Sequence, residues 1–172
     1  MEREGKTVVI LVSTKGAQAL IAVADTIKDS SKSAIGELHA LGIYTMMLTG
    51  DNPHTAQAIS TQAGIDRAQG NLLPQDKLRE VEQLALTGKV GMVGDGINDA
   101  PALARADIGF AMGAAGTDTA IETADVALMD DDLRKIPTFV RLSRATAQVL
   151  MQNIVLALGI KAVFLVLTFT GQ

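Results

Sequence analysis

The sequence predicts an α/β protein in which helices cover a parallel sheet, followed by a transmembrane helix. Apolar, strand-like runs alternate with helical segments between residues 25 and 129, which is the pattern of a parallel sheet covered on both faces. Glycine, asparagine and proline mark the turns between these segments. Over residues 149–170 the only charged residue is Lys161. A helix of that length spans roughly 33 Å, which is enough to cross a bilayer core.

The composition excludes several classes of function. A formal net charge of -4 argues against a general nucleic-acid binder, so we expect no nucleic-acid partner. The absence of cysteine excludes disulfides, thiolate metal sites and thiol nucleophiles. Neither His39 nor His54 belongs to a cluster with metal-ligand spacing, and we expect both to be surface or packing residues.

The first 24 residues predict a β-hairpin. Apolar runs at residues 7–12 and 19–24 flank the turn-like sequence Ser13-Thr14-Lys15-Gly16. No further partner strand is evident for these two runs. We therefore expect residues 1–24 to be the edge of a larger structure that continues upstream.

Local signals place the elements of residues 25–129 in order. Asp29 and its neighbouring serines can cap a helix, Pro53 occupies the first helical position of the next, and a third begins near Pro74. Helices are predicted over residues 29–42, 53–64, 74–88, 100–105 and 118–124. Strands are predicted over residues 43–48, 89–93, 108–112 and 126–129.

The most specific pattern follows the apolar run 90–93, which predicts a buried strand. There, Gly94 and Gly96 allow a sharp turn and a close approach to a ligand, while Asp95, Asn98 and Asp99 offer the oxygen ligands that Mg²⁺ prefers. A single aspartate in such a turn could simply cap a helix. An ordinary turn requires neither the second acid nor both glycines, so the whole loop predicts a metal site.

Two further groups are expected near the carboxyl ends of the predicted strands, where open α/β sheets bind ligands. Thr49-Gly50-Asp51-Asn52 combines a hydroxyl, a glycine and a helix N-terminus, which together suit a phosphoryl oxygen. Lys77, near the start of its helix, could reach a phosphate as a point charge. Considered alone, Lys77 is better explained as a solvated surface lysine. The combination of a hydroxyl, this lysine and paired acids on one sheet favours a phosphate site.

Three motifs occur in the order found in one known family. They are Thr49-Gly50-Asp51-Asn52, Pro74-Gln75-Asp76-Lys77 and Gly94-Asp95-Gly96-Ile97-Asn98-Asp99-Ala100-Pro101. The sequence resembles the phosphorylation domain of P-type cation-transporting ATPases, which belong to the haloacid dehalogenase superfamily. The resemblance continues through Met112-Gly113, Gly116-Thr117-Asp118 and Glu122-Thr123-Ala124-Asp125 into the membrane segment. It implies a haloacid-dehalogenase-like, Rossmann-like fold over residues 25–129.

The resemblance implies a role for each phosphate-binding residue. Thr49 would hydrogen-bond the phosphoryl group of an aspartyl-phosphate. Gly50 and Asp51 would lie beside the nucleotide and the catalytic site. Lys77 would neutralise the phosphoryl charge. ATP is therefore an implied ligand of this part of the chain.

The resemblance also implies a magnesium site. Asp95 and Asp99 would bind Mg²⁺, and Asn98 would complete the catalytic site. The family's nucleophile, however, is the aspartate of an Asp-Lys-Thr-Gly-Thr motif, which this sequence does not contain. Residues 13–16 are no substitute, because they lack the carboxylate that must form the acyl phosphate.

In the family, the nucleophilic aspartate lies upstream of the nucleotide-binding domain, and residues 1–24 resemble the last strands of that domain. The resemblance therefore predicts a C-terminal-side fragment of a transporter, whose partner is the missing remainder. Residues 25–129 would be a phosphorylation domain without its nucleophile strand. We predict that the chain alone is inactive.

Residues 130–148 predict a helical connector, in which Pro137 marks a break or a first turn, and residues 149–170 predict the membrane helix. Four basic residues lie before the apolar segment: Arg134, Lys135, Arg141 and Arg144. Basic residues beside a membrane helix favour the cytoplasmic side. We expect a chain in the plasma or inner membrane with its catalytic part in the cytoplasm.

Lys161 lies near the middle of the apolar segment, where a lysine costs about 2.5 to 3.5 kcal/mol. The segment around Lys161 is similar to the corresponding helix of zinc, cadmium and lead exporters, through Gln152-Asn153 and Leu158-Gly159-Ile160-Lys161. In those exporters the lysine is thought to be a counter-ion near the transported metal. Copper exporters, which carry a Tyr-Asn pair in this helix, resemble it less. Snorkelling or structural pairing is the alternative explanation for Lys161.

Two other functions remain open. A membrane-anchored phosphatase of the haloacid dehalogenase type would need a nucleophilic aspartate ahead of Thr49, and neither Asp25 nor Asp29 has suitable surroundings. A truncated, non-catalytic protein that binds Mg²⁺ or phosphate and acts as a regulator is the second alternative. The coding sequence upstream would distinguish a regulator from a transporter.

Overall fold

The computed structural model describes residues 7–14, 16–23, 26–94, 97–113, 118–130 and 132–171. The chain divides into two units, Met1–Arg134 and Lys135–Gln172, which are considered separately below. Asp95 and Gly96 of the predicted metal loop lie outside the described residues, as do Gly116 and Thr117.

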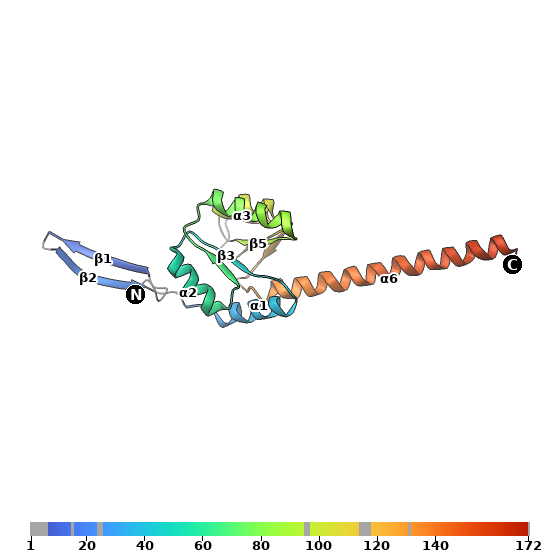
Figure 1. Cartoon of the computed structure of the whole chain (residues 1–172), viewed down its shortest axis with the longest axis horizontal. Helices are drawn as coiled ribbons and strands as arrows, with labels where there is room; N and C mark the ends of the chain where they lie inside the picture. The colour runs from blue at the N-terminus through green and yellow to red at the C-terminus, as the bar shows by residue number, and fades with distance from the viewer. Residues whose placement is uncertain are drawn as a thin grey trace. The chain divides into compact units, whose positions relative to one another are not determined.

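The first two strands form the predicted hairpin. β1 (Thr7–Ser13) pairs antiparallel with β2 (Gly16–Val23), shown in blue in Figure 1. Gly16 has a φ of 109°, in the left-handed region that favours glycine. Large apolar side chains of both strands are more than half exposed, among them Val12 at 65%. A two-stranded hairpin is marginally stable by itself.

Five further strands form two parallel sheets. The first sheet pairs β3 (Met46–Leu48) with β4 (Arg67–Gln69), and the second has the order β5 (Gly91–Gly94), β6 (Ile108–Met112) and β7 (Val126–Leu128). Parallel pairing confirms the predicted fold class. β3 is shorter than the predicted strand 43–48. The sequence did not predict β4, because its three residues show no run of apolar side chains.

The helices begin and end close to the predicted positions. They are α1 (Asp29–Ala40), α2 (Pro53–Ala63), α3 (Pro74–Thr87), α4 (Ala100–Arg105) and α5 (Asp118–Thr123), with a short 3₁₀ turn, η2 (Ile97–Asp99), before α4. Pro53 is the first residue of α2, and Gly64 ends that helix with a φ of 77°. Backbone preferences of Pro53 and Gly64 therefore set the ends of α2. The predicted cap of the first helix is wrong, because the N-cap of α1 is Lys28, which makes no side-chain cap hydrogen bond, and Asp29 is already helical.

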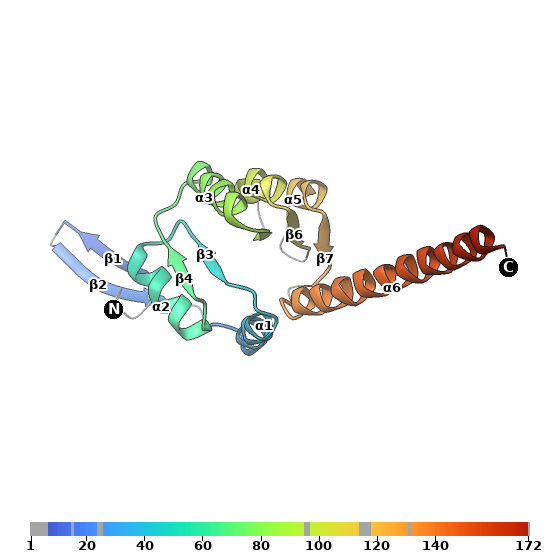
Figure 2. The ribbon, with the colours of Figure 1, turned by 45° about the vertical axis from the view of Figure 1, so that its right-hand side comes forward.

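The described core lies between β6 and the helices that cover it. Leu103 of α4 and Ala111 of β6 are fully buried, and Ile121 of α5 packs against them. Helices α3, α4 and α5 line up along the β5–β6–β7 sheet (Figure 2). A Cβ atom on Gly109 would lie 2.9 Å from the carbonyl oxygen of Leu103, so β6 and α4 are in close contact. This packing holds the end of β5 and the start of α4 together.

β5 is less buried than its apolar sequence predicts. Val93 is 36% exposed, and Gly91 is also exposed. β5 pairs with β6 on one side, and within the described part of the chain no strand pairs with its other edge. The expectation of a buried strand is therefore wrong for this structure, because β5 is an edge strand.

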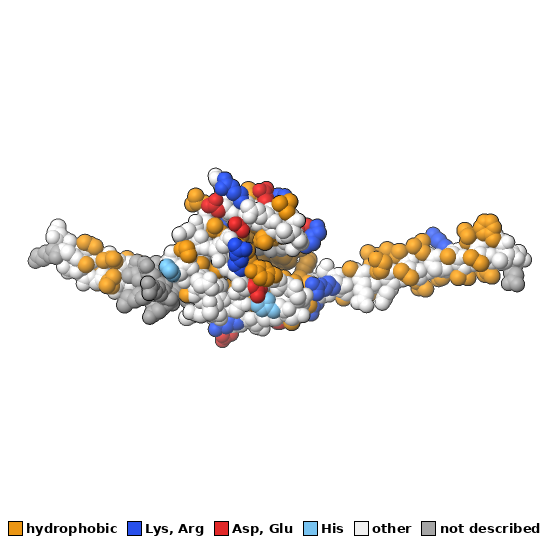
Figure 3. Space-filling view, viewed as in Figure 1, with side chains coloured by type: hydrophobic (Ala, Val, Ile, Leu, Met, Phe, Trp, Pro, Cys, Tyr) orange, Lys and Arg blue, Asp and Glu red, His pale blue; other side chains and the backbone are white. Residues whose placement is uncertain are grey.

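The second unit is α6 (Lys135–Thr170), one continuous helix of 36 residues. It includes residues 135–148 of the predicted connector and the whole predicted membrane segment. Pro137 lies in its first turn, where the missing N–H has no helical acceptor. Within the described residues, α6 is the one helix whose length and apolar composition would allow it to cross a membrane. Hydrophobic side chains cover its C-terminal part in Figure 3.

Candidate functional site

Thr49, Gly50 and Asp51 lie in the turn between β3 and α2. The Thr49 hydroxyl donates to the Asp51 carboxylate at 2.9 Å and accepts from the Asp51 backbone N–H at 3.1 Å. The Asn52 side chain accepts from the Thr55 N–H at 2.9 Å and so caps α2. The hydroxyl is therefore held close to a helix N-terminus, where backbone N–H groups stabilise an anion.

A second loop, residues 70–73, supports this turn. The Leu72 N–H donates to the Thr49 carbonyl at 3.0 Å, and the Asn71 N–H donates to the Asp51 carbonyl at 2.6 Å. Asn71 has a φ of 57°, a left-handed conformation that asparagine tolerates better than most residues. The loop leads directly into the first turn of α3. The Thr49 turn and the start of α3 are thus joined by backbone hydrogen bonds and a short connection.

Lys77 and Asp99 form an ion pair, with 2.8 Å between Lys77 Nζ and Asp99 Oδ1. Lys77 lies in the first turn of α3, and Asp99 ends η2. Their side chains are 17% and 12% exposed. The Asp76 carboxylate accepts from the Leu73 N–H at 3.1 Å and so stabilises the turn that carries Lys77. Since both charges are largely removed from water, loss of one partner would be costly.

Gly94, the last residue of β5, makes room for Asp99. A Cβ atom on Gly94 would lie 2.7 Å from the Asp99 Cβ. Any larger residue at position 94 would therefore displace the carboxylate from Lys77. The sequence analysis expected a ligand to approach this glycine, and that expectation stays a prediction; the neighbour that the structure shows is Asp99.

The predicted site residues fall into two described groups, the Thr49–Asp51 turn and the Lys77–Asp99 pair. The described side-chain hydrogen bonds of these four residues stay within each group. Asn98 is exposed. In the part of the chain that the structure describes, no three His, Cys, Asp or Glu side chains gather closely enough to hold a metal ion.

The chemistry of the described loop nevertheless fits magnesium. Asn98 and Asp99 supply oxygen donors of the kind that Mg²⁺ prefers, and they are adjacent in the chain. The third predicted donor, Asp95, lies outside the described residues. The magnesium site therefore remains a prediction.

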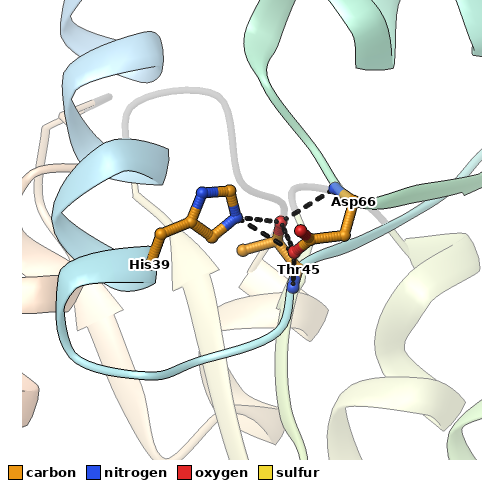
Figure 4. A network of polar contacts seen from close by, with 3 residues as sticks. All are labelled: His39, Thr45 and Asp66. Carbon is orange, nitrogen blue, oxygen red and sulfur yellow. Dashed lines mark hydrogen bonds and ion pairs between the residues drawn. The ribbon is translucent and has the colours of Figure 1, made fainter.

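A polar network that the sequence analysis did not predict connects α1 with the segments that lead into β3 and β4. Asp66 Oδ2 accepts from the Thr45 N–H at 2.7 Å, from the Thr45 hydroxyl at 2.8 Å and from His39 Nε2 at 3.0 Å (Figure 4). The backbone hydrogen bond from Thr45 is the main reason why the pKa of Asp66 is lowered, and the Thr45 hydroxyl and His39 lower it further. No spacing signal in the sequence relates these three residues.

This network does not have the geometry of a catalytic triad. Thr45 and Asp66 both contact the same ring nitrogen of His39. In a triad, the hydroxyl and the carboxylate contact opposite nitrogens of the imidazole. We interpret the network as a structural connection between α1 and the β3–β4 sheet.

Comparison with known proteins places this geometry in a family. The family model described as "haloacid dehalogenase-like hydrolase" matches residues 2–107, which is more than half of the chain. The chain belongs to this family, which confirms the predicted fold class.

More specific relatives match nearly the whole chain. It is 54% identical over 99% of its length to a probable cadmium-transporting ATPase of Listeria monocytogenes. It is 48% identical over 92% of its length to a copper-exporting P-type ATPase of Staphylococcus aureus (strain JH9). A crystal structure of a zinc-transporting PIB-type ATPase in the E2·Pi state superposes with a TM-score of 0.89, at 46% identity over 99% of this chain.

These matches confirm the resemblance to heavy-metal P-type ATPases, which are ion-translocating hydrolases. The chain covers 24% of the cadmium relative, 20% of the copper relative and 28% of the zinc transporter of known structure. It thus spans about a quarter of the length of the curated relatives that it matches.

Proposed function

We propose that this chain is part of an ATP-driven exporter of heavy-metal cations. In this proposal it supplies the magnesium-binding and phosphoryl-stabilising half of an aspartyl-phosphate site. The contact between Lys77 and Asp99, which lies in the predicted metal loop of residues 94–101, carries the proposal. The chain that contains this contact matches zinc and cadmium transporters over 99% of its length. Residues 1–24 are, in this proposal, the end of a nucleotide-binding domain.

The residues of the site act by placing charge and hydrogen-bond donors around a phosphoryl group. Thr49 donates its hydroxyl to a phosphoryl oxygen, and Gly50 and Asp51 lie beside the nucleotide. Lys77 neutralises the phosphoryl charge. Mg²⁺, held by Asp95, Asp99 and Asn98, would add positive charge at the phosphoryl oxygens.

The separation of the two parallel sheets supports the proposal that a nucleophile strand comes from polypeptide upstream of this chain. Thr49 follows the carboxyl end of β3, and the metal loop follows the carboxyl end of β5. A parallel strand between β3 and β5 would pair with both at a spacing of about 4.8 Å. It would bring its own carboxyl end, and an aspartate there, to the same edge of the sheet as Thr49 and Asp99. The exposure of Val93 agrees with this arrangement.

We infer that the transported cation is divalent zinc, cadmium or lead. The higher identity to the cadmium relative than to the copper relative supports this choice, as does Lys161 within the apolar part of α6. In this proposal α6 spans the plasma or inner membrane, Lys161 lies near the path of the metal, and the first unit is cytoplasmic.

The proposal is tested by comparing the isolated chain with a longer protein that contains the upstream polypeptide. With Mg²⁺ and radiolabelled ATP, the isolated chain should form no phosphoenzyme and hydrolyse no ATP, because it lacks the nucleophile. The longer protein should form an acid-stable phosphoenzyme and hydrolyse ATP in response to zinc or cadmium. In the longer protein, Lys77→Ala should reduce phosphorylation by about 10²-fold or more. The matched control is Arg79→Ala on the exposed side of the same helix.

Other results would contradict the proposal. Mg²⁺-dependent turnover by the isolated chain that disappears in Asp95→Ala would instead support a membrane-anchored phosphatase. A longer protein that binds Mg²⁺ and phosphate but forms no phosphoenzyme would support a regulatory protein.

A further inference from the structure

The backbone between the Thr49 turn and Lys77 is held by hydrogen bonds at two successive residues. The Leu72 N–H donates to the Thr49 carbonyl at 3.0 Å. The next residue, Leu73, donates its N–H to Asp76 Oδ2 at 3.1 Å, and its carbonyl accepts from the Lys77 N–H at 3.1 Å. These bonds lie where the chain passes from β4 into α3 (Figure 2). They link the backbone position of Lys77 to that of Thr49.

Asp76 supplies the side-chain hydrogen bond of this link. Leu73 precedes the first residue of α3, and leucine has no side-chain oxygen with which to cap a helix. The Asp76 carboxylate instead reaches back to the Leu73 N–H, which is one half of a capping box. Its other oxygen, Oδ1, lies 3.3 Å from Arg79 Nη1. The carboxylate therefore fixes the residue at which α3 begins.

The place of α3 in turn decides where the charge of Lys77 lies. Lys77 Nζ is 2.8 Å from Asp99, but a lysine side chain is flexible, so the reach of its ammonium group also depends on where its backbone is fixed. A displacement of about 1 Å at a reacting centre can slow a reaction by about 100-fold. Without the bond between Asp76 and Leu73, the first turn of α3 could shift relative to Thr49.

We propose that Asp76 is a positioning residue for phosphoryl transfer, which holds Lys77 in place relative to Thr49 through the Leu73 N–H. This inference rests on the proposed function, in which Thr49 and Lys77 contact the same phosphoryl group. Asp76 acts through Lys77 and makes no contact with that group. Its effect on phosphorylation should therefore depend on the presence of Lys77.

The longer protein that contains the upstream polypeptide tests this role, through the rate of phosphoenzyme formation from radiolabelled ATP. Asp76→Ala should lower the maximal rate about tenfold. The ATP concentration that gives half of this rate should change less than about twofold, because the variant alters the placement of Lys77 and not the binding of ATP. Asp76→Asn keeps an oxygen that can accept from the Leu73 N–H, so its maximal rate should stay within about twofold of wild type.

Two further variants separate positioning from a general loss of stability. In a Lys77→Ala protein, Asp76→Ala should cause no further loss of rate, because the ammonium group that it positions is absent. The matched control is Gln83→Gly, at an exposed position of α3. Glycine within a helix weakens it by an amount comparable with the loss of a cap, while the contact between Asp76 and Leu73 remains. Gln83→Gly should form the phosphoenzyme at the wild-type rate.

The results distinguish this role from the proposed function. If the wild-type longer protein forms a phosphoenzyme and Asp76→Ala matches its rate, the positioning role is wrong while the proposed function stands. The same conclusion follows if Asp76→Asn or Gln83→Gly is as slow as Asp76→Ala. It also follows if Asp76→Ala slows the Lys77→Ala protein by the same factor as it slows the wild type. If the wild-type longer protein forms no phosphoenzyme, the proposed function and the positioning role are both wrong.

Discussion

Asp66 connects three segments through one carboxylate oxygen. Its pKa is lowered mainly by the backbone hydrogen bond from Thr45. Because its pKa is lowered, the Asp66 carboxylate stabilises the folded protein fully above the pKa of an unfolded aspartate, about 3.9. This contribution to the free energy of unfolding is lost as the pH falls through the lower pKa of the folded state. We predict that Asp66→Ala lowers the unfolding temperature at pH 7 and that its difference from wild type disappears under strongly acidic conditions.

Thermal unfolding of the full chain in detergent, followed from pH 7 into the strongly acidic range below the folded-state pKa of Asp66, checks this prediction. Thr45→Val is the matched variant, because it removes the hydroxyl donor but keeps the backbone donor and should give a smaller effect. An Asp66→Ala chain that differs from wild type by the same amount at every pH would show that the carboxylate does not act in this way.

The ion pair between Lys77 and Asp99 contributes to stability as well as to the proposed chemistry. Lys77→Met would leave the Asp99 carboxylate, 12% exposed, without its charged partner. We expect a loss of about 2 to 4 kcal/mol in the free energy of unfolding. Denaturant unfolding of Lys77→Met, Asp99→Asn and the double variant measures the coupling, and the double variant should lose less than the two single losses together. An equal effect of Arg79→Met, on the exposed side of α3, would contradict this.

At the level of elements, the contact between β6 and α4 depends on Gly109. An added Cβ would lie 2.9 Å from the Leu103 carbonyl oxygen and 3.5 Å from the Ala124 Cα, both of which are backbone atoms. We predict that Gly109→Ala costs about 1 to 3 kcal/mol in the free energy of unfolding, because the strand must move from its helix.

Gly36→Ala is the matched control, since an added Cβ at this exposed position of α1 meets no atom within 4 Å. Alanine should stabilise this helix by about 0.5 to 1 kcal/mol. Denaturant unfolding of both variants measures the contrast. A Gly109→Ala chain as stable as wild type would show that β6 and α4 have room to separate.

For the whole molecule, the proposed upstream strand should protect both sheets at once. In the longer protein, amide hydrogen exchange at Leu48 of β3 and Val93 of β5 should slow on the order of tenfold or more. Their N–H groups point away from β4 and β6, so a strand between β3 and β5 would give them hydrogen-bond acceptors and exclude water. Ala111 of β6 already lies between two strands and should change less. Equal exchange rates at Leu48 and Val93 in the two proteins would contradict a strand between β3 and β5.

The sequence alone identified the motif residues and most helix boundaries, because both depend on short stretches of chain. Pro53 and Gly64 mark the two ends of α2 through their own backbone preferences. Likewise, Thr49 and Asp99 belong to motifs whose chemistry can be recognised without knowing the fold. The resemblance to P-type ATPases rested on these local patterns, and the relatives confirmed it.

Only the tertiary structure decided which of these residues meet. Lys77 and Asp99 are 22 positions apart, and Asp66 contacts His39 from 27 positions away. The division into two parallel sheets and the exposure of Val93 also had no local signal. The physical reason is that hydrogen bonds and ion pairs between distant segments depend on how elements pack, whereas caps and turns depend on the conformational preferences of neighbouring residues.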